Sequence, residues 1–119
     1  MNNAKNLLDM LNEMANLRPS DTGLSVFIWV DEMGGYRNTE HNIPRLKIAV
    51  DNPSNQVAVV SISETPELLE GGLKLGFNKI KKWIILNYPE LLEHWNGDIS
   101  TAVLFKNIKR VKSTTAKQV

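Results

Sequence analysis

A charged loop holds most of the side chains that can take part in chemistry. Residues 31–44 read DEMGGYRNTEHNIP, and they bring Arg37, Glu40 and His41 within a few positions of one another. An acid, a histidine and an arginine together suit general acid–base chemistry. No spacing in the chain matches a GxSxG, HExxH or phosphate-loop signature. We therefore expect no catalytic residue, and a metal-free enzyme using His41 remains the weaker alternative.

Metal ligands are sparse in this sequence. It contains no cysteine, and its two histidines, His41 and His94, stand far apart with no ligand-like spacing around them. Structural and catalytic zinc sites need three or four such ligands. The sequence thus predicts no metal and no cofactor. We expect His94 to lie on the surface of a helix or at an interface.

Two cations follow the loop directly. Arg45 and Lys47 lie two positions apart in a β-rich run, and with Arg37 and His41 they form the candidate binding set for an acidic partner or a phosphate. Further basic residues gather near the end of the chain, with no acid among them: Lys106, Lys109, Arg110, Lys112 and Lys117. Such a run is either a phosphate-binding patch or a helix end whose carbonyls favour cations. The net charge of +1 argues against strong general attraction to nucleic acid.

Strands are predicted in the middle of the chain. Residues 24–30 (LSVFIWV), 45–50 (RLKIAV) and 56–63 (QVAVVSIS) are rich in β-branched and aromatic residues. The second and third runs are joined by DNPSN, a dense group of turn formers. The pattern predicts a three-stranded antiparallel meander, and ETPELLEGG (64–72) is expected to leave the sheet.

From Leu73 the apolar spacing changes to the helical period. Phe77, Ile80, Ile84, Tyr88, Leu91 and Trp95 form one stripe, flanked by Trp83. Pro89 predicts a break near Asn87, with the proline in the first turn of a second helix. Trp83, Ile84 and Trp95 are expected in the core. A last helix is predicted from Ile99 to about Lys109, capped by Asp98.

The first residues also repeat with helical spacing. Residues 4–17 predict an amphipathic helix whose apolar stripe includes Leu7, Leu11 and Met14. Residues 18–23 (RPSDTG) predict a linker. A helix of this length is marginal alone in water. Its stripe is therefore expected to pack on its own domain, or to dock on a protein partner or a second copy as an arm.

These elements predict an α+β protein: a small three-stranded antiparallel sheet with helices packed on one face, plus the N-terminal amphipathic helix. The 119 residues divide into an arm (1–19), one domain (20–111) and a basic tail (112–119). No stretch reaches the ~18 apolar residues that span a bilayer, and the start lacks the pattern of a signal peptide. We expect a cytoplasmic protein with no membrane contact.

Four segments carry a family resemblance. EHNIPRLKI, AVVSIS, LLEGGL and KKWIILNYPELLEHW follow one another in order between Asp31 and Trp95. In this order they resemble the bacterial domain-of-unknown-function family 4160, which has a His-Asn-Pro-Pro-His-x-His segment entering its second strand. Here His41, Asn42 and Pro44 match the start of that segment, whereas the next two histidines of the family fall on Arg45 and Lys47.

The resemblance implies a function as well as a limit. Members of the family often look like one half of a toxin–antitoxin-like pair, which implies a protein partner or a homo-oligomer, with RNA as a possible further ligand. A metal chemistry carried by the histidine cluster would be lost here, because two cations replace two ligands. We therefore expect a small protein-binding factor of a toxin–antitoxin-like module or a mobile element. The alternative is a nucleic-acid binder or degenerate nuclease using residues 31–47 and the basic C-terminus.

Overall fold

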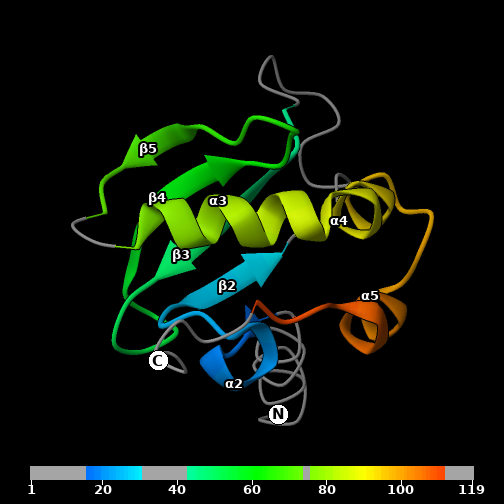
Figure 1. Cartoon of the computed structure of the whole chain (residues 1–119), viewed down its shortest axis with the longest axis horizontal. Coiled ribbons are helices and arrows are strands. Elements are labelled where there is room, and N and C mark those ends of the chain that lie inside the picture. The colour runs from blue at the N-terminus through cyan, green and yellow to red at the C-terminus, as the bar shows by residue number, and fades with distance from the viewer. Residues whose placement is uncertain (1–15, 31–42, 74–75, 112–119) are drawn as a thin grey trace, which may run out of the picture.

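A twisted antiparallel sheet forms one layer of the molecule, and helices form the other (Figure 1). The computed structural model describes residues 16–30, 43–73 and 76–111. Within these ranges the sheet has five strands in the order β1-β2-β3-β4-β5, and every neighbouring pair is antiparallel. The strands are β1 (Asn16–Leu17), β2 (Phe27–Val30), β3 (Arg45–Ala49), β4 (Gln56–Ser61) and β5 (Leu68–Gly71).

The helical layer is formed mainly by the second half of the chain. The described helices are α2 (Pro19–Thr22), α3 (Phe77–Leu86), α4 (Tyr88–Trp95) and α5 (Thr101–Asn107). Helix α3 lies across one face of the sheet, and α4 and α5 follow beyond its end (Figure 1). The arrangement is α+β. No helix among the described residues is long and apolar enough to cross a bilayer.

The expected three-stranded sheet is wrong, because two short edge strands extend the meander to five. The central strands β2, β3 and β4 pair as predicted. Asn16 and Leu17 were assigned to the end of a helix, but they form β1 beside β2. Residues 68–71 were expected to leave the sheet, but they form β5 beside β4. Strands of two and four residues are too short to show an alternating pattern, so only their neighbours reveal them.

The core lies between the sheet and α3. Alternate residues of the strands point to this side, including Ile28, Ile48 and Val60, and all three are completely buried. Trp83 and Ile84 meet them from α3, and both are also fully buried. Burial of each such side chain stabilises the fold by about 1.5–3 kcal/mol. The predicted core positions Trp83, Ile84 and Trp95 are confirmed.

The break between α3 and α4 falls at Asn87, as predicted. Its side-chain amide donates to the carbonyls of Trp83 (3.0 Å) and Lys109 (3.1 Å), and its Oδ1 accepts from the Lys109 backbone amide (2.8 Å). Pro89 lies in the first turn of α4, where no backbone donor is needed. A fully buried asparagine thus joins both helices to the segment that follows α5.

The expected linker 18–23 is instead a single turn of helix, α2 (Pro19–Thr22), and the residues that end it contact Val111. The backbone amide of Arg18 donates to Asp21 Oδ2 at 3.0 Å. The Val111 amide donates to the Thr22 carbonyl at 2.9 Å. Gly23 has a positive φ of 83°, and a Cβ there would lie 2.2 Å from the Val111 carbonyl oxygen. Only glycine allows this close approach.

Helix α5 begins two residues later than predicted. Ser100 rather than Asp98 is its N-cap, and the Ser100 hydroxyl accepts a hydrogen bond from the Val103 amide at 3.2 Å. Serine and aspartate are equally good caps, so the sequence alone leaves the choice between them open.

Candidate functional site

The predicted binding residues Arg45 and Lys47 both lie on β3. Leu46 and Ile48, which alternate with them, are buried in the core, so the two cations point to the opposite side of the sheet. We call that side the outer face and the side covered by α3 the inner face. The other predicted site residues, Arg37, His41, Leu7, Leu11 and Met14, lie outside the described residues.

Strand register places Lys47 in the middle of a row of side chains on the outer face. Trp29 on β2 is opposite Lys47, Lys47 is opposite Val59 on β4, and Val59 is opposite Glu70 on β5. Asn16 on β1 extends the row beyond Trp29. Directly opposed residues in antiparallel strands have Cβ atoms about 4.5–5.5 Å apart. Across the strands, the row therefore places an aromatic ring, a cation, a branched apolar side chain and an anion side by side.

A groove of about 250 Å³ opens on the outer face over β4. Val57 and Val59 are half-buried in it, Lys47 borders it from β3, and Glu70 and Gly71 border it from β5. Its floor is apolar, and its two long sides carry opposite charges. Alternate strand residues are roughly 6.5 Å apart, so the two valines give the floor the repeat of an extended chain.

Gly71 holds β5 close to the groove. It has a positive φ of 74°, and a Cβ on it would lie 1.9 Å from the Val57 carbonyl oxygen. The Gly72 amide donates to that same carbonyl at 3.1 Å. The absence of a side chain at Gly71 thus permits the backbone contact and also leaves this end of the groove open.

Trp29, on the other side of Lys47 from the groove, is fixed by the β3–β4 turn. Its indole Nε1 donates to the Pro53 carbonyl at 2.6 Å. The turn itself is held by Asn52 Oδ1, which accepts from the Ser54 amide and hydroxyl, and by Asn55 Nδ2, which donates to the Val50 carbonyl. The tryptophan therefore presents a ring of defined orientation, which lowers the entropy lost when that ring contacts a partner.

Lys109, one of the basic residues near the C-terminus, does not join Arg45 and Lys47. Lys109 Nζ lies 3.4 Å from Glu90 Oε2 of α4, and the Lys109 backbone is bonded to Asn87. This places Lys109 in the helical layer, whereas Lys47 faces the other side of the sheet. Lys112 and Lys117 lie outside the described residues.

His94 is buried rather than exposed as expected. It lies in the last turn of α4 with 2% of its surface accessible, and its Nε2 is 2.9 Å from the Thr101 hydroxyl of α5. This contact links two consecutive helices. In the described part of the chain, no three histidine, cysteine, aspartate or glutamate residues gather as a metal-binding group.

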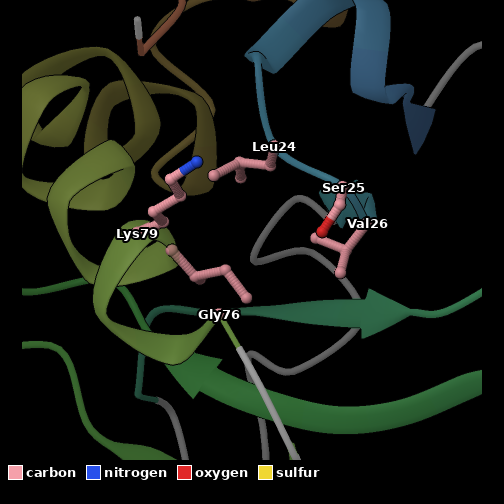
Figure 2. Close-up of a pocket in the computed structure, with 6 residues that line it drawn as sticks. Leu24, Ser25, Val26, Gly76 and Lys79 are labelled. Atoms are coloured by element: carbon pink, nitrogen blue, oxygen red, sulfur yellow. The ribbon is translucent and has the colours of Figure 1, made fainter. Parts of the chain in front are cut away.

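A second, smaller cavity lies between the start of α3 and the segment that leads into β2 (Figure 2). Leu24, Ser25 and Val26 line one side, and Gly76, Lys79 and Ile80 line the other. Its volume of about 20 Å³ holds about one water molecule. This cavity is too small for an organic ligand. Of these two cavities, both lined by described residues, the groove over β4 is the one large enough to be a candidate site.

Sequence reasoning found Lys47 but missed Trp29, Val59 and Glu70. The signal was present for the first two, because alternation in the runs 24–30 and 56–63 separates them from buried neighbours. Glu70 lacked such a signal, since β5 is visible only through its pairing with β4.

Comparisons with known proteins identify no relative. No protein-family profile, curated protein or solved structure matches this chain. The resemblance to family 4160 therefore stays a prediction.

Proposed function

We propose that this protein is a binding module that contacts another polypeptide through the outer face of its sheet. The observation that carries the proposal is the groove over β4, with its valine floor between Lys47 and Glu70. Aromatic and apolar side chains surrounded by charged groups are the usual composition of a protein interface. Trp29, held beside Lys47 by its bond to Pro53, supplies the aromatic member.

Contact through the face is favoured over strand addition at an edge. The edge strand β5 has four residues, and its pairing with β4 shifts register between Val59 and Val60. Short, irregular edge strands disfavour pairing with another chain.

A nucleic-acid ligand is the second candidate. Arg45 and Lys47 share the outer face with Trp29, and cations beside an aromatic ring suit a single strand. Glu70 on the same groove repels phosphate, and Lys109 contacts Glu90 in the other layer. A protein partner is therefore the better fit. Nucleic-acid binding would appear as an affinity that falls steeply with salt concentration.

The family resemblance adds a biological setting to this proposal. A toxin–antitoxin-like or mobile-element role, in the cytoplasm, would make the partner a protein encoded beside this one. Co-expression with each neighbouring gene product, followed by co-purification, tests that setting. Loss of co-purification in Val59→Asp would assign the contact to the groove.

The binding proposal is tested by site-specific photo-crosslinking in the full chain. Gln56 and Asn78 are both exposed, the first at the groove and the second on α3. A photoreactive residue at position 56 is expected to crosslink a polypeptide, and one at position 78 is not. The crosslink at position 56 should disappear when Val59→Asp is added. Equal crosslinking at both positions would refute the proposal.

A further inference from the structure

Two opposite charges flank the centre of the groove at equal distances. Lys47 and Glu70 lie on either side of Val59, one strand away in each direction. Two strand spacings separate their backbones by roughly 9.5 Å. Across the groove the order of groups is therefore cation, apolar side chain, anion. Read from β5 to β3 instead, the order is anion, apolar side chain, cation.

This order of charges is complementary to itself under a two-fold rotation. In an isologous dimer the same surface of each copy meets the other after a rotation of 180°. An axis along β4, midway between two outer faces, places β4 over the partner's β4 and β3 over the partner's β5. Lys47 then faces the partner's Glu70, and Val59 faces the partner's Val59. A face with charges of one sign would instead bring like charges together.

We propose that the occupant of the groove is a second copy of this chain, bound face to face with reciprocal contacts between Lys47 and the partner's Glu70. This proposal rests on the proposed function and specifies its partner. Two sheets packed in this way lie about 10 Å apart and enclose the side chains between them. The pairing covers Val57 and Val59 on both copies, which are only half-buried in one chain.

The same arrangement accounts for the position of Trp29. β2 lies two strands from β4, and β5 lies one strand from β4. After the rotation, β2 of one copy extends just beyond the partner's β5. Trp29 then lies above the outer edge of that strand and closes the rim of the interface. Water is excluded more completely when apolar groups at the rim surround the buried contacts.

Charge exchange tests the contact directly. We would measure the dissociation constant of the full-length dimer by sedimentation for the parent chain, Lys47→Glu, Glu70→Lys and the double variant. Each single variant brings two pairs of like charge together, so it should weaken dimerisation by at least about tenfold. The double variant restores both pairs and should dimerise within about threefold of the parent.

Mixing the two single variants gives a sharper result. Lys47→Glu carries two anions at the groove, and Glu70→Lys carries two cations. Each should be largely monomeric alone, and the equimolar mixture should form a heterodimer at least as readily as the parent forms its dimer. A variant that had merely lost its fold would not recover in this way.

Matched controls reverse exposed charges in the helical layer. Lys82→Glu on α3 and Glu93→Lys on α4 should leave the dissociation constant unchanged. Should Lys47→Glu fail to fold, Glu70→Lys and Val59→Asp still test the interface, because both alter side chains of the groove without touching the core. Circular dichroism melts would verify their folding.

Several results would overturn the inference. A parent chain that sediments as a monomer at roughly millimolar concentration excludes a dimer of useful affinity. If the dissociation constant of the dimer is unchanged in Lys47→Glu, Glu70→Lys and Val59→Asp, the interface lies elsewhere. A crosslink from position 56 to a different polypeptide, with the chain itself monomeric, would refute self-association and keep the proposed function. A crosslink to nucleic acid alone would refute both.

Discussion

The two faces of the sheet differ although the same strands form them. On β4, Val60 points to the inner face and is completely buried, whereas its neighbour Val59 points to the outer face and is half-buried. On β3, Ile48 and Lys47 show the same contrast. Helix α3 covers the inner face, so side chains there are packed on all sides. The packing that stabilises the fold is therefore concentrated on the inner face, which leaves the residues of the outer face available for recognition.

Tryptophan offers the largest test of this contrast. Trp83→Ala removes a fully buried side chain from the inner layer and should lower the free energy of unfolding by about 3–5 kcal/mol. Trp29→Ala removes a half-buried ring and its bond to Pro53, and should cost about 1–2 kcal/mol. Denaturant titrations of both variants would measure the difference.

A control uses the polar atom of Trp83. Its indole Nε1 is buried and has no hydrogen-bond partner among the described residues. Trp83→Phe keeps much of the ring and removes that atom, so it should cost clearly less than Trp83→Ala. Equal losses for Trp83→Ala and Trp29→Ala would show that the two faces contribute alike.

Asn87 tests how the helical layer tolerates a buried polar group. Asn87→Ala leaves the Lys109 amide and carbonyl without their side-chain partner and removes one of two donors to the Trp83 carbonyl, and should cost about 3 kcal/mol. Gln56→Ala, an exposed amide at the groove, should change stability by less than about 0.5 kcal/mol. Thermal melts of the two variants are the measurement. A stable Asn87→Ala would mean that the α3–α4 junction is held by apolar packing alone.

Adjacent valines give the most closely matched pair. Val60→Ala on the inner face should cost about 2 kcal/mol, because two methyl groups and their packing are lost from the core. Val59→Ala on the outer face should cost less than half of that in the isolated chain. The experiment needs low protein concentration, at which self-association makes no contribution. A larger loss at position 59 would assign the core to the wrong face.

Gly71 and Gly72 lie at the border of the groove, and substitutions there should have the smallest effect on the stability of the whole molecule. Gly71→Ala introduces a Cβ into a left-handed backbone, which alone costs about 1–2 kcal/mol, and the clash of that Cβ with the Val57 carbonyl oxygen adds to this loss, which should be concentrated in β5. Gly72→Ala meets nothing within 4 Å and should be neutral. Amide hydrogen exchange of β5 would locate the loss. Equal protection in both variants would contradict a close β4–β5 contact.

The parts of the fold that the sequence predicted have long or unambiguous patterns. The stripe from Phe77 to Trp95 identified the core helices, and Pro89 identified the break between them. The turn at 51–55 identified the β3–β4 hairpin. The linker expected at 18–23 was wrong because its turn formers also suit a short capped helix.

The candidate site was predicted only in part. Lys47 stood out because it takes the place of a histidine in the segment that resembles family 4160. Trp29 and Glu70 join it only after four strands are aligned, from positions 18 and 23 residues away in the chain. The alignment of one strand with the next depends on which residues both strands bury. The residues of one strand alone therefore do not specify which residues lie opposite them.

The amino-acid sequence alone was enough to predict the alternation of β2, β3 and β4, the break between α3 and α4, and a core built from both helices and strands. These are local properties, set by side-chain period and backbone chemistry within a few residues. The tertiary structure decided that residues 16–17 and 68–71 complete the sheet, and that His94 is buried against Thr101. It also decided that Lys47, Val59 and Glu70 share one row. Their alignment arises from packing between segments distant in sequence, where burial of the inner face fixes what the outer face presents.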